Sequence, residues 1–370
     1  MTRKTTPAAA TLLLAIALCP LACQRSTAHP PQSNSAAPSP PATKVPALAL
    51  GYENDLVEFD INTGRPLRRQ AIGARPSESS SVVPGHYLAF SSDGQTVYAL
   101  IRRSDQAASV VALDRRTLAR RWSTELPAHA GQPRALAVGP RTGTVFAFTN
   151  NTVGPGIQGF APRAEAVVSE LDSGGTLRAS VVVRRPDLAS SAPEDWFILD
   201  GLVNTDETRL YASFHNQGLF DFDLALSGPI PRCSGRICLE AHGDVALWNG
   251  SILTATGSRE LRLISREGVL QATFDTQLDR NHLMAFALDL AAQFAYAIGS
   301  CEYVPGMTSI NLKTGEPRVI VPQAASSQAC GDRVVFAKGR LLVGPAVKVI
   351  DPLTGAMLVN TRLLAIDIQV

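Results

Sequence analysis

The sequence predicts an all-β protein, a seven-bladed β-propeller that is closed by its own C-terminal strand. Three observations lead to this prediction: a strand-and-turn phrase that recurs seven times, further pairs of apolar strands before most copies, and a surplus strand at the C-terminus. A repeat of about 40 to 50 residues is typical of a four-stranded propeller blade. We expect the propeller to span residues 46–370.

The recurring phrase is an apolar strand that ends in a short polar residue, followed by a turn and a second strand. It is clearest in Val57–Gly64 and Val347–Gly355. Asp or Asn can bond to the backbone downstream, and Gly adopts positive φ without a steric cost, so the phrase predicts a tight hairpin. The polar residue stands at positions 60, 114, 172, 223, 265, 311 and 351, with spacings from 40 (311 to 351) to 58 (114 to 172) residues.

Two more short strands precede most copies of the phrase. In the second repeat they are Tyr87–Phe90 and Val97–Leu100, which flank Ser92-Asp93-Gly94. Their near-continuous apolar runs are typical of sheets that are packed on both faces. Each repeat therefore holds four strands.

The two ends of the propeller predict how the ring closes. One strand, Ala47–Tyr52, precedes the first turn, and one strand, Leu363–Val370, is left over after the seventh repeat. We expect the C-terminal strand to complete the first blade, because closure removes exposed sheet edges.

The phrase that ends in Asp60–Gly64 is shared by repeats of the YVTN and quinoprotein-like β-propeller superfamily, which the sequence resembles over nearly all of residues 46–370. The resemblance, like one to WD40 repeats, is architectural. The Trp-rich docking signatures of quinone-cofactor dehydrogenases are absent, because Trp122, Trp196 and Trp248 stand at unrelated repeat positions. We therefore expect no cofactor.

The N-terminus has the features of a signal peptide over residues 1–22. Arg3 and Lys4 precede an apolar stretch, Ala8–Ala22, that is too short for a stable membrane span. Leu18–Cys23 resembles a bacterial lipobox, which implies that Cys23 takes lipid and becomes the new N-terminus. Cleavage after Ala28 is the alternative, and both alternatives predict export.

Residues 23–45 are predicted to be a disordered tether, because their Pro, Ser and Ala content cannot bury enough apolar surface to offset chain entropy. Loss of residues 1–22 removes two of 34 basic residues and none of 32 acidic ones, which leaves a formally neutral chain. A neutral surface lacks the basic excess that nucleic acid requires. Gln24, where the inner-membrane retention signal of enteric bacteria has aspartate, favours the outer membrane, on either its periplasmic or its outer side.

Candidate binding residues lie in the loops that enter the innermost strands. They are His86, His129, Trp196, His242 and His282, near one rim of the ring. The histidines have two interpretations, a metal cluster, since neutral imidazole is a common ligand, or structural residues that bond to a neighbouring turn. Because no pair has ligand spacing along the chain, we expect the second and predict no metal.

The cysteines of the propeller suit an oxidising compartment. Cys233 and Cys238 are predicted to close a small loop in an insertion, and Cys301 and Cys330 to bridge adjacent blades on one rim. A zinc site with a histidine is the alternative, but no CxxC spacing supports it.

Two further segments carry alternatives. Asn150–Arg163 is predicted to form a long rim loop in the third blade, either a binding loop or a disordered excursion. Glu194, Asp195 and Asp200 have the residue types of a glycoside hydrolase acid and base, but solvated loop charges are the preferred interpretation. No nucleophile elbow, phosphate loop, HExxH or EF-hand motif is present, and we predict no catalytic residue.

A tethered ring with long rim loops and no catalytic motif predicts a non-catalytic binding or scaffold module at the cell envelope. Its expected partner is an envelope protein or another macromolecule, with the membrane reached through the N-terminal lipid. The alternatives are a propeller enzyme, such as a lactonase-like hydrolase or a dehydrogenase, and a small-ligand sensor with its site where the central channel opens.

Overall fold

In the computed structural model, Lys44–Val370 form one compact unit. The structure describes residues 44–74, 86–103, 107–154, 163–183, 198–214, 218–224, 232–238, 241–256, 259–278, 283–299, 306–321, 333–365 and 367–370. The predicted signal peptide, Cys23 and nearly all of the tether lie outside these ranges, so they stay predictions. Within these ranges, no helix has the length and apolar character needed to cross a bilayer.

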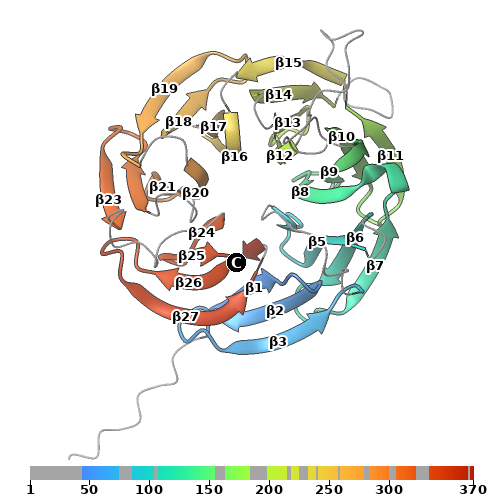
Figure 1. The fold of residues 1–370 in the computed structure, drawn as a ribbon, viewed down its shortest axis with the longest axis horizontal. Coiled ribbons are helices and arrows are strands. Elements are labelled where there is room, and N and C mark those ends of the chain that lie inside the picture. Colours follow the sequence, from blue (N-terminus) through green and yellow to red (C-terminus); the bar gives the residue numbers. More distant parts are fainter. Residues whose placement is uncertain are drawn as a thin grey trace, which may run out of the picture. The chain divides into compact units, whose positions relative to one another are not determined.

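The unit Lys44–Val370 is a seven-bladed β-propeller whose described residues form seven four-stranded antiparallel sheets around one axis (Figure 1). From the axis outward, blade 1 has β28 (Asp367–Gln369), β1 (Pro46–Leu50), β2 (Asp55–Asp60) and β3 (Pro66–Ala71); blade 2 has β4 (Leu88–Phe90), β5 (Thr96–Arg102), β6 (Ala108–Asp114) and β7 (Arg120–Glu125); blade 3 has β8 (Gln132–Val138), β9 (Val145–Gly154), β10 (Arg163–Leu171) and β11 (Leu177–Val182). Blade 4 has β12 (Ile198–Val203), β13 (Arg209–Phe214), β14 (Gly218–Asp223) and β15 (Arg232–Cys238); blade 5 has β16 (Ala241–Trp248), β17 (Ser251–Thr256), β18 (Glu260–Ile264) and β19 (Leu270–Asp275); blade 6 has β20 (Leu283–Asp289), β21 (Phe294–Gly299), β22 (Met307–Asn311) and β23 (Pro317–Val321); blade 7 has β24 (Arg333–Ala337), β25 (Arg340–Gly344), β26 (Ala346–Ile350) and β27 (Met357–Leu364).

The core lies between the blades, as the apolar runs predicted. All seven residues of β5 are buried, whereas the outer strands β3 and β7 contain only half-buried and exposed residues. The middle strands are covered by both neighbouring blades, so apolar residues are favoured on both of their faces. Sequence pattern and packing therefore agree on which strands lie inside.

The recurring phrase is the hairpin between the third and fourth strands of a blade. In blade 1 the Asp60 carboxylate accepts hydrogen bonds from the Asn62 N–H (3.2 Å) and the Thr63 hydroxyl (2.9 Å), and Gly64 has φ +70°. The same bond to the N–H two residues downstream is made by Asp114, Asp172, Ser265, Asn311 and Asp351. In the degraded blade-4 copy, Asp223 instead lies 3.8 Å from Arg209.

The predicted closure is confirmed. Strand β28 pairs with β1, with Leu48 opposite Gln369 and Leu50 opposite Asp367, so blade 1 is built from both ends of the propeller. The closing strand begins at Asp367, however, and not at Leu363. Residues up to Leu364 still belong to β27, and the Ala365 N–H donates to the Pro345 carbonyl (2.8 Å) before the chain turns inward.

Two predicted loops are partly strand. Strand β9 runs to Gly154 and β10 starts at Arg163, so the predicted rim loop shrinks to residues 155–162, which lie outside the described ranges. Cys233 and Cys238 belong to β15, the fourth strand of blade 4, and not to an insertion. Their register partners Phe222 and Leu219 are three residues apart on β14, a separation of about 10 Å. The bond between Cys233 and Cys238 stays a prediction, because the structure does not describe their side chains.

Candidate functional site

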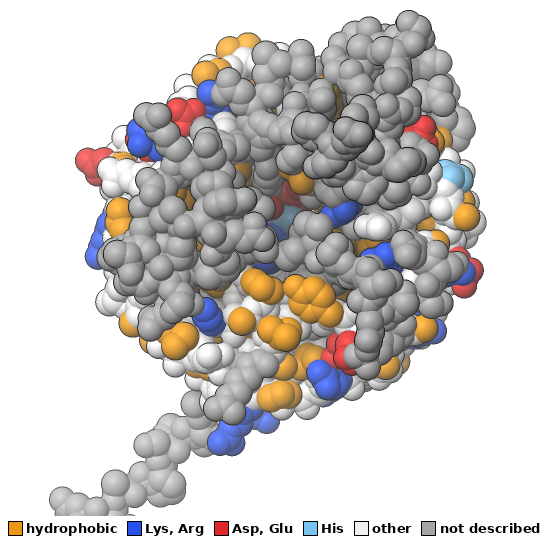
Figure 2. Space-filling model, in the orientation of Figure 1, with side chains coloured by type: hydrophobic (Ala, Val, Ile, Leu, Met, Phe, Trp, Pro, Cys, Tyr) orange, Lys and Arg blue, Asp and Glu red, His pale blue; other side chains and the backbone are white. Residues whose placement is uncertain are grey.

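Charged side chains from five blades meet on the propeller axis. We call this group the axial cluster: His86 (blade 2), Asp200 (blade 4), Asp244 (blade 5), Arg333 (blade 7) and Asp367 (blade 1). Each residue lies on an innermost strand or, for His86, two residues before one. Figure 2 shows acidic, basic and histidine side chains together in the hollow at the middle of the ring.

The three aspartates each join one blade to the next through the main chain. Asp200 accepts from the Val245 N–H of blade 5 (2.9 Å), and Asp244 accepts from the Phe286 N–H of blade 6 (3.3 Å). Asp367 makes the same bond to the Leu88 N–H of blade 2 (2.6 Å). Hydrogen bonds to ionised acceptors are stronger than hydrogen bonds to neutral acceptors, so this repeated geometry fixes the spacing of neighbouring innermost strands.

Arg333 is the positive centre of the axial cluster and is only 4% exposed. Its Nε donates to Asp367 Oδ1 at 2.7 Å, its Nη1 lies 3.7 Å from Asp244 Oδ2, and Nη1 also bonds to the His86 ring. A buried charge is tolerated only when it is paired and hydrogen-bonded. Arg333 therefore offsets the charge of aspartates that would otherwise repel one another.

His86 connects blades that are not neighbours in the ring. Its Nε2 lies 3.1 Å from Asp244 Oδ1 and 3.5 Å from Asp200 Oδ2, on the far side of the axis from blade 2. Its main-chain carbonyl also accepts from the Leu136 N–H of blade 3 (2.7 Å). The side chain thus spans the axis while the backbone is fixed to the adjacent blade.

The charges of the axial cluster raise the pKa of His86. Burial and the charge of Arg333 lower the pKa of His86, but Asp200 and Asp244 raise it by more, so the net pKa lies above the ordinary value. Burial, together with the charge of Asp244, raises the pKa of Asp200. Burial lowers the pKa of Arg333, but the three carboxylates raise it further, so Arg333 stays charged.

Three members of the cluster have the donor atoms of a metal site. His86, Asp200 and Asp244 offer one nitrogen and two oxygens that all lie within 4.8 Å of one another. Arg333 contacts both His86 and Asp244, however, and already places a fixed positive charge beside these atoms. That charge opposes a second cation, so the donor set fits a metal poorly.

The cluster is also poorly arranged for acid–base chemistry on a substrate. Asp200 is 1% exposed, and its two oxygens accept from the Gly201 N–H (2.8 Å) and the Val245 N–H. Asp367 is fully buried and bonded to Arg333, Leu88 and Ile368. A general base must reach the proton that it removes, and these carboxylates are occupied by their own protein.

The structure separates the predicted rim residues. His86 lies in the axial cluster, whereas His129, in the short helix η1 (Ala128–Ala130), is exposed and bonds through Nε2 to the Ser180 hydroxyl of the outer strand β11 (3.2 Å). Trp196 and His282 lie outside the described residues, and His242 is described only as part of strand β16.

One prediction about Asp200 was wrong, and three residues of the axial cluster were not predicted. Asp200 is a buried residue of β12 and not a solvated loop charge, while Glu194 and Asp195 lie outside the described ranges. Asp244, Arg333 and Asp367 are not among the site residues predicted from the sequence. A usable signal was present for Arg333, which starts an otherwise apolar innermost strand, whereas Asp244 and Asp367 share their strands with the polar residues His242 and Gln369.

Comparison with known proteins supports the fold. No family model matches the chain, and no curated protein matches it in sequence. Solved structures do match. One, from Bacteroides fragilis NCTC 9343 and with a name that suggests a 6-phosphogluconolactonase, has a TM-score of 0.61 at 14% identity, over 90% of this chain and 99% of that one.

Two more matches show how broad this likeness is. A similarly named protein from Bacteroides uniformis ATCC 8492 has a TM-score of 0.59 at 18% identity, over 88% of this chain and 98% of that one. The WD40 repeats of RRP9 have a TM-score of 0.55 at 9% identity, over 81% of this chain and 83% of that one. At such identities the likeness shows the propeller fold alone, since one fold hosts many functions.

Proposed function

We propose that the chain is an exported, lipid-anchored β-propeller that binds a protein or other macromolecular partner at the cell envelope without catalysing a reaction. One observation carries the non-catalytic part. The aspartates of the axial cluster each accept a hydrogen bond from a main-chain N–H of the next blade. Their chemistry is used to hold the ring together.

The exported part rests on the N-terminal sequence. A basic start, a short apolar stretch and the Leu18–Cys23 lipobox direct the chain to the envelope, and Gln24 favours the outer membrane. A lipid on Cys23 followed by a tether that cannot fold would leave the propeller free to meet a partner near the membrane.

Exposed apolar side chains on blades 6 and 7 supply the binding surface of this proposal. Val319 on β23 is 45% exposed, Leu353 is 67% exposed, and Met357 and Leu358 on β27 are 40% and 44% exposed. Arg318 Nη2 donates to the Leu353 carbonyl at 3.0 Å, which brings these two blades together at this surface. Large exposed apolar side chains are candidates for interaction sites on soluble proteins.

Cross-linking in native envelopes, followed by mass spectrometry, tests the proposal. The expected result is one partner in reproducible stoichiometry, lost in Leu358→Asp but kept in Val269→Asp, a control at a 62% exposed residue of blade 5. Fractionation of Cys23→Ala tests the anchor, because this variant should leave the membrane fraction. Turnover of a substrate that is lost in His86→Gln would instead establish an enzyme.

A further inference from the structure

Basic side chains gather on the outer strands of blades 1 and 2. Residues 61–71 and 115–125, which hold β3, β7 and the turns before them, contain seven arginines and one acidic residue, Glu125. The corresponding residues 266–275 of blade 5 contain one arginine and two acidic residues. Charge is therefore distributed unevenly around a ring whose predicted mature chain is formally neutral. We call the seven arginines the basic rim: Arg65, Arg68, Arg69, Arg115, Arg116, Arg120 and Arg121.

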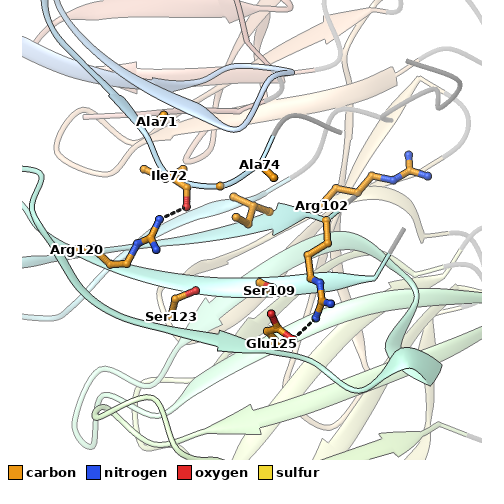
Figure 3. Close-up of a pocket in the computed structure, with 11 residues that line it drawn as sticks. Ala71, Ile72, Ala74, Arg102, Ser109, Arg120, Ser123 and Glu125 are labelled. Atoms are coloured by element: carbon orange, nitrogen blue, oxygen red, sulfur yellow. Dashed lines mark hydrogen bonds and ion pairs between the residues drawn. The ribbon is translucent and has the colours of Figure 1, made fainter. Parts of the chain in front are cut away.

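Hydrogen bonds between the two blades join the two halves of the basic rim. Arg68 of blade 1 donates to the carbonyls of Arg115 (3.4 Å) and Arg116 in the turn before β7. Arg120 of blade 2, which lines a cavity of about 410 Å³ between the blades, donates to the Ile72 carbonyl of blade 1 at 2.9 Å (Figure 3). The arginines of the two blades therefore adjoin one another.

Acidic side chains neutralise only part of this charge. Three carboxylates on β2 and β6 pair with four of the arginines at 2.7 to 2.8 Å: Glu58 with Arg68 and Arg115, Asp55 with Arg69, and Asp114 with Arg121. Glu125 pairs with Arg103, which is outside the basic rim. Arg65 and Arg116, in the turns before β3 and β7, are exposed. The basic rim therefore keeps a formal excess of positive charge at the surface.

The chain enters the propeller beside the basic rim. The Val45 N–H donates to Asp60 Oδ1 at 3.1 Å, and Pro46 is opposite Asp60 in the register of β1 with β2. On the other side of the same turn, the Asp60 N–H donates to the Arg65 carbonyl at 3.0 Å. Lys44, which is exposed, adds a positive charge at this point. The basic rim thus lies where the described chain begins.

The position of this entry matters because of the lipid anchor in the proposed function. A flexible chain as long as the predicted tether, residues 23–45, has a root-mean-square end-to-end distance of about 25 Å. A lipid on Cys23 would therefore keep the basic rim within about that distance of the membrane surface. Tethering gives a second, weaker contact a high effective concentration, so a surface at this place needs little affinity of its own.

We propose that the basic rim lies against anionic phospholipid headgroups, so that blades 1 and 2 face the membrane. The proposal deepens the anchored propeller of the proposed function and rests on it. A guanidinium matches paired phosphate oxygens, and each basic residue at an anionic lipid surface strengthens binding about fivefold. Such a contact is weak and reversible without a lipid anchor, which agrees with the expected loss of Cys23→Ala from the membrane fraction.

Vesicle sedimentation of the full mature chain with Cys23→Ala tests the contact without the anchor. The probes are phosphatidylcholine vesicles with and without about 30% phosphatidylglycerol, at about 50 mM and about 500 mM salt. The expected result is binding only to the anionic vesicles and only at low salt, because salt screens exposed charges. Absence of binding to the anionic vesicles, equal binding to neutral ones, or binding that persists at high salt overturns the proposal.

Two double variants on this Cys23→Ala background locate the contact. Arg65→Gln with Arg116→Gln removes two exposed charges of the basic rim and should weaken binding to the anionic vesicles at least about tenfold. The matched control, Arg141→Gln with Lys313→Gln, removes the same charge from exposed turns of blades 3 and 6 and should bind within about twofold of its parent. Equal weakening in the two double variants overturns the proposal.

The same variants distinguish a membrane from an acidic protein. If vesicles do not bind but Arg65→Gln with Arg116→Gln loses the cross-linked protein partner, the surface belongs to that protein and the proposal is wrong. The assay contains no lipid on Cys23, so its failure leaves the anchor unaffected. Failure of the anchor shows instead as a wild-type chain in the soluble fraction of the cell envelope preparation.

Discussion

Asp367 accepts a 2.7 Å hydrogen bond from Arg333 across the junction between the last blade and the first, with both side chains buried. The other carboxylate oxygen of Asp367 accepts the Leu88 N–H of blade 2. One residue of the closing strand is thus bonded to blades on both sides of blade 1. The closure depends on this carboxylate as well as on the backbone pairing of β28 with β1.

Removal of Asp367–Val370 should abolish cooperative folding. The deletion takes away the innermost strand of blade 1, exposes the edge of β1 and leaves Arg333 buried without Asp367. Circular dichroism during urea unfolding should show a broad transition in place of a single one. A deletion of residues 25–40 of the predicted tether is the control, and a truncated propeller that unfolds as sharply as this control would contradict the closure.

The stability of the propeller should fall as pH rises above neutral. The pKa of His86 is raised in the folded state, so its contribution is complete below the ordinary value of about 6.5 and is lost as pH rises through the folded value. The raised pKa of Asp200 acts in the same direction, because the contribution of Asp200 to stability is complete below its ordinary pKa and is lost as pH rises through the folded value. Urea unfolding from pH 6 to pH 9 measures the effect.

In that series, His86→Gln should show a clearly smaller fall in the free energy of unfolding than the wild type. The groups that face His86 are Asp200, Asp244 and Arg333, and all three remain in the variant. His129→Gln is the control, since His129 is exposed and lies outside the axial cluster. Equal slopes for His86→Gln and the wild type would show that His86 does not titrate with the fold.

Glu58 should stabilise the contact between blades 1 and 2 above acidic pH. It is 7% exposed and bonds to Arg68 Nε and to Arg115 Nη1 of blade 2, both at 2.7 Å. Burial raises its pKa, but the two arginines lower it by more, so the contribution exists above the ordinary value and disappears as pH falls through the folded one.

Glu58→Gln should therefore lower the free energy of unfolding by roughly 2 kcal/mol at pH 7, the size expected for hydrogen bonds to a charged group. It should also lose less stability than the wild type between pH 5 and pH 3. Glu316→Gln, at an exposed residue, is the matched control. A Glu58→Gln variant as stable as this control would show that the ion pairs contribute little.

Non-reducing peptide mapping should find Cys301 joined to Cys330. Both lie outside the described residues, and the prediction rests on their positions in adjacent repeats of a chain that the N-terminal sequence predicts to be exported. Alkylation of both Cys301 and Cys330 without prior reduction would contradict the pairing.

The sequence predicts this fold well because the decisive interactions are local. The Asp60 turn is formed by residues two to four positions apart, and apolar runs such as that of β5 follow directly from burial on both faces. The closing strand was also visible, as a run of apolar residues left over after the last complete repeat. The residue at which the closing strand begins could not be predicted, because β27 continues to Leu364 in an equally apolar segment.

The axial cluster could not be predicted in the same way. Arg333 and His86 are 247 residues apart in the chain, and Asp367 and Leu88 are 279 apart. Whether such residues meet depends on the number of blades and on which residue of each innermost strand faces the axis. Local patterns mark Arg333 as a charge at the start of an apolar strand but do not identify its partners.

The central claim is that the axial cluster holds the ring together and does not catalyse a reaction. A double-mutant cycle of Arg333→Met and Asp367→Leu, measured by urea unfolding, tests it most directly. The account predicts that each single change lowers the free energy of unfolding by about 3 to 5 kcal/mol and that the double variant loses much less than the sum, because no buried charge is left unpaired. The account would be contradicted if the single variants were as stable as the wild type or more stable. That pattern is typical of residues that are kept for activity at a cost in stability.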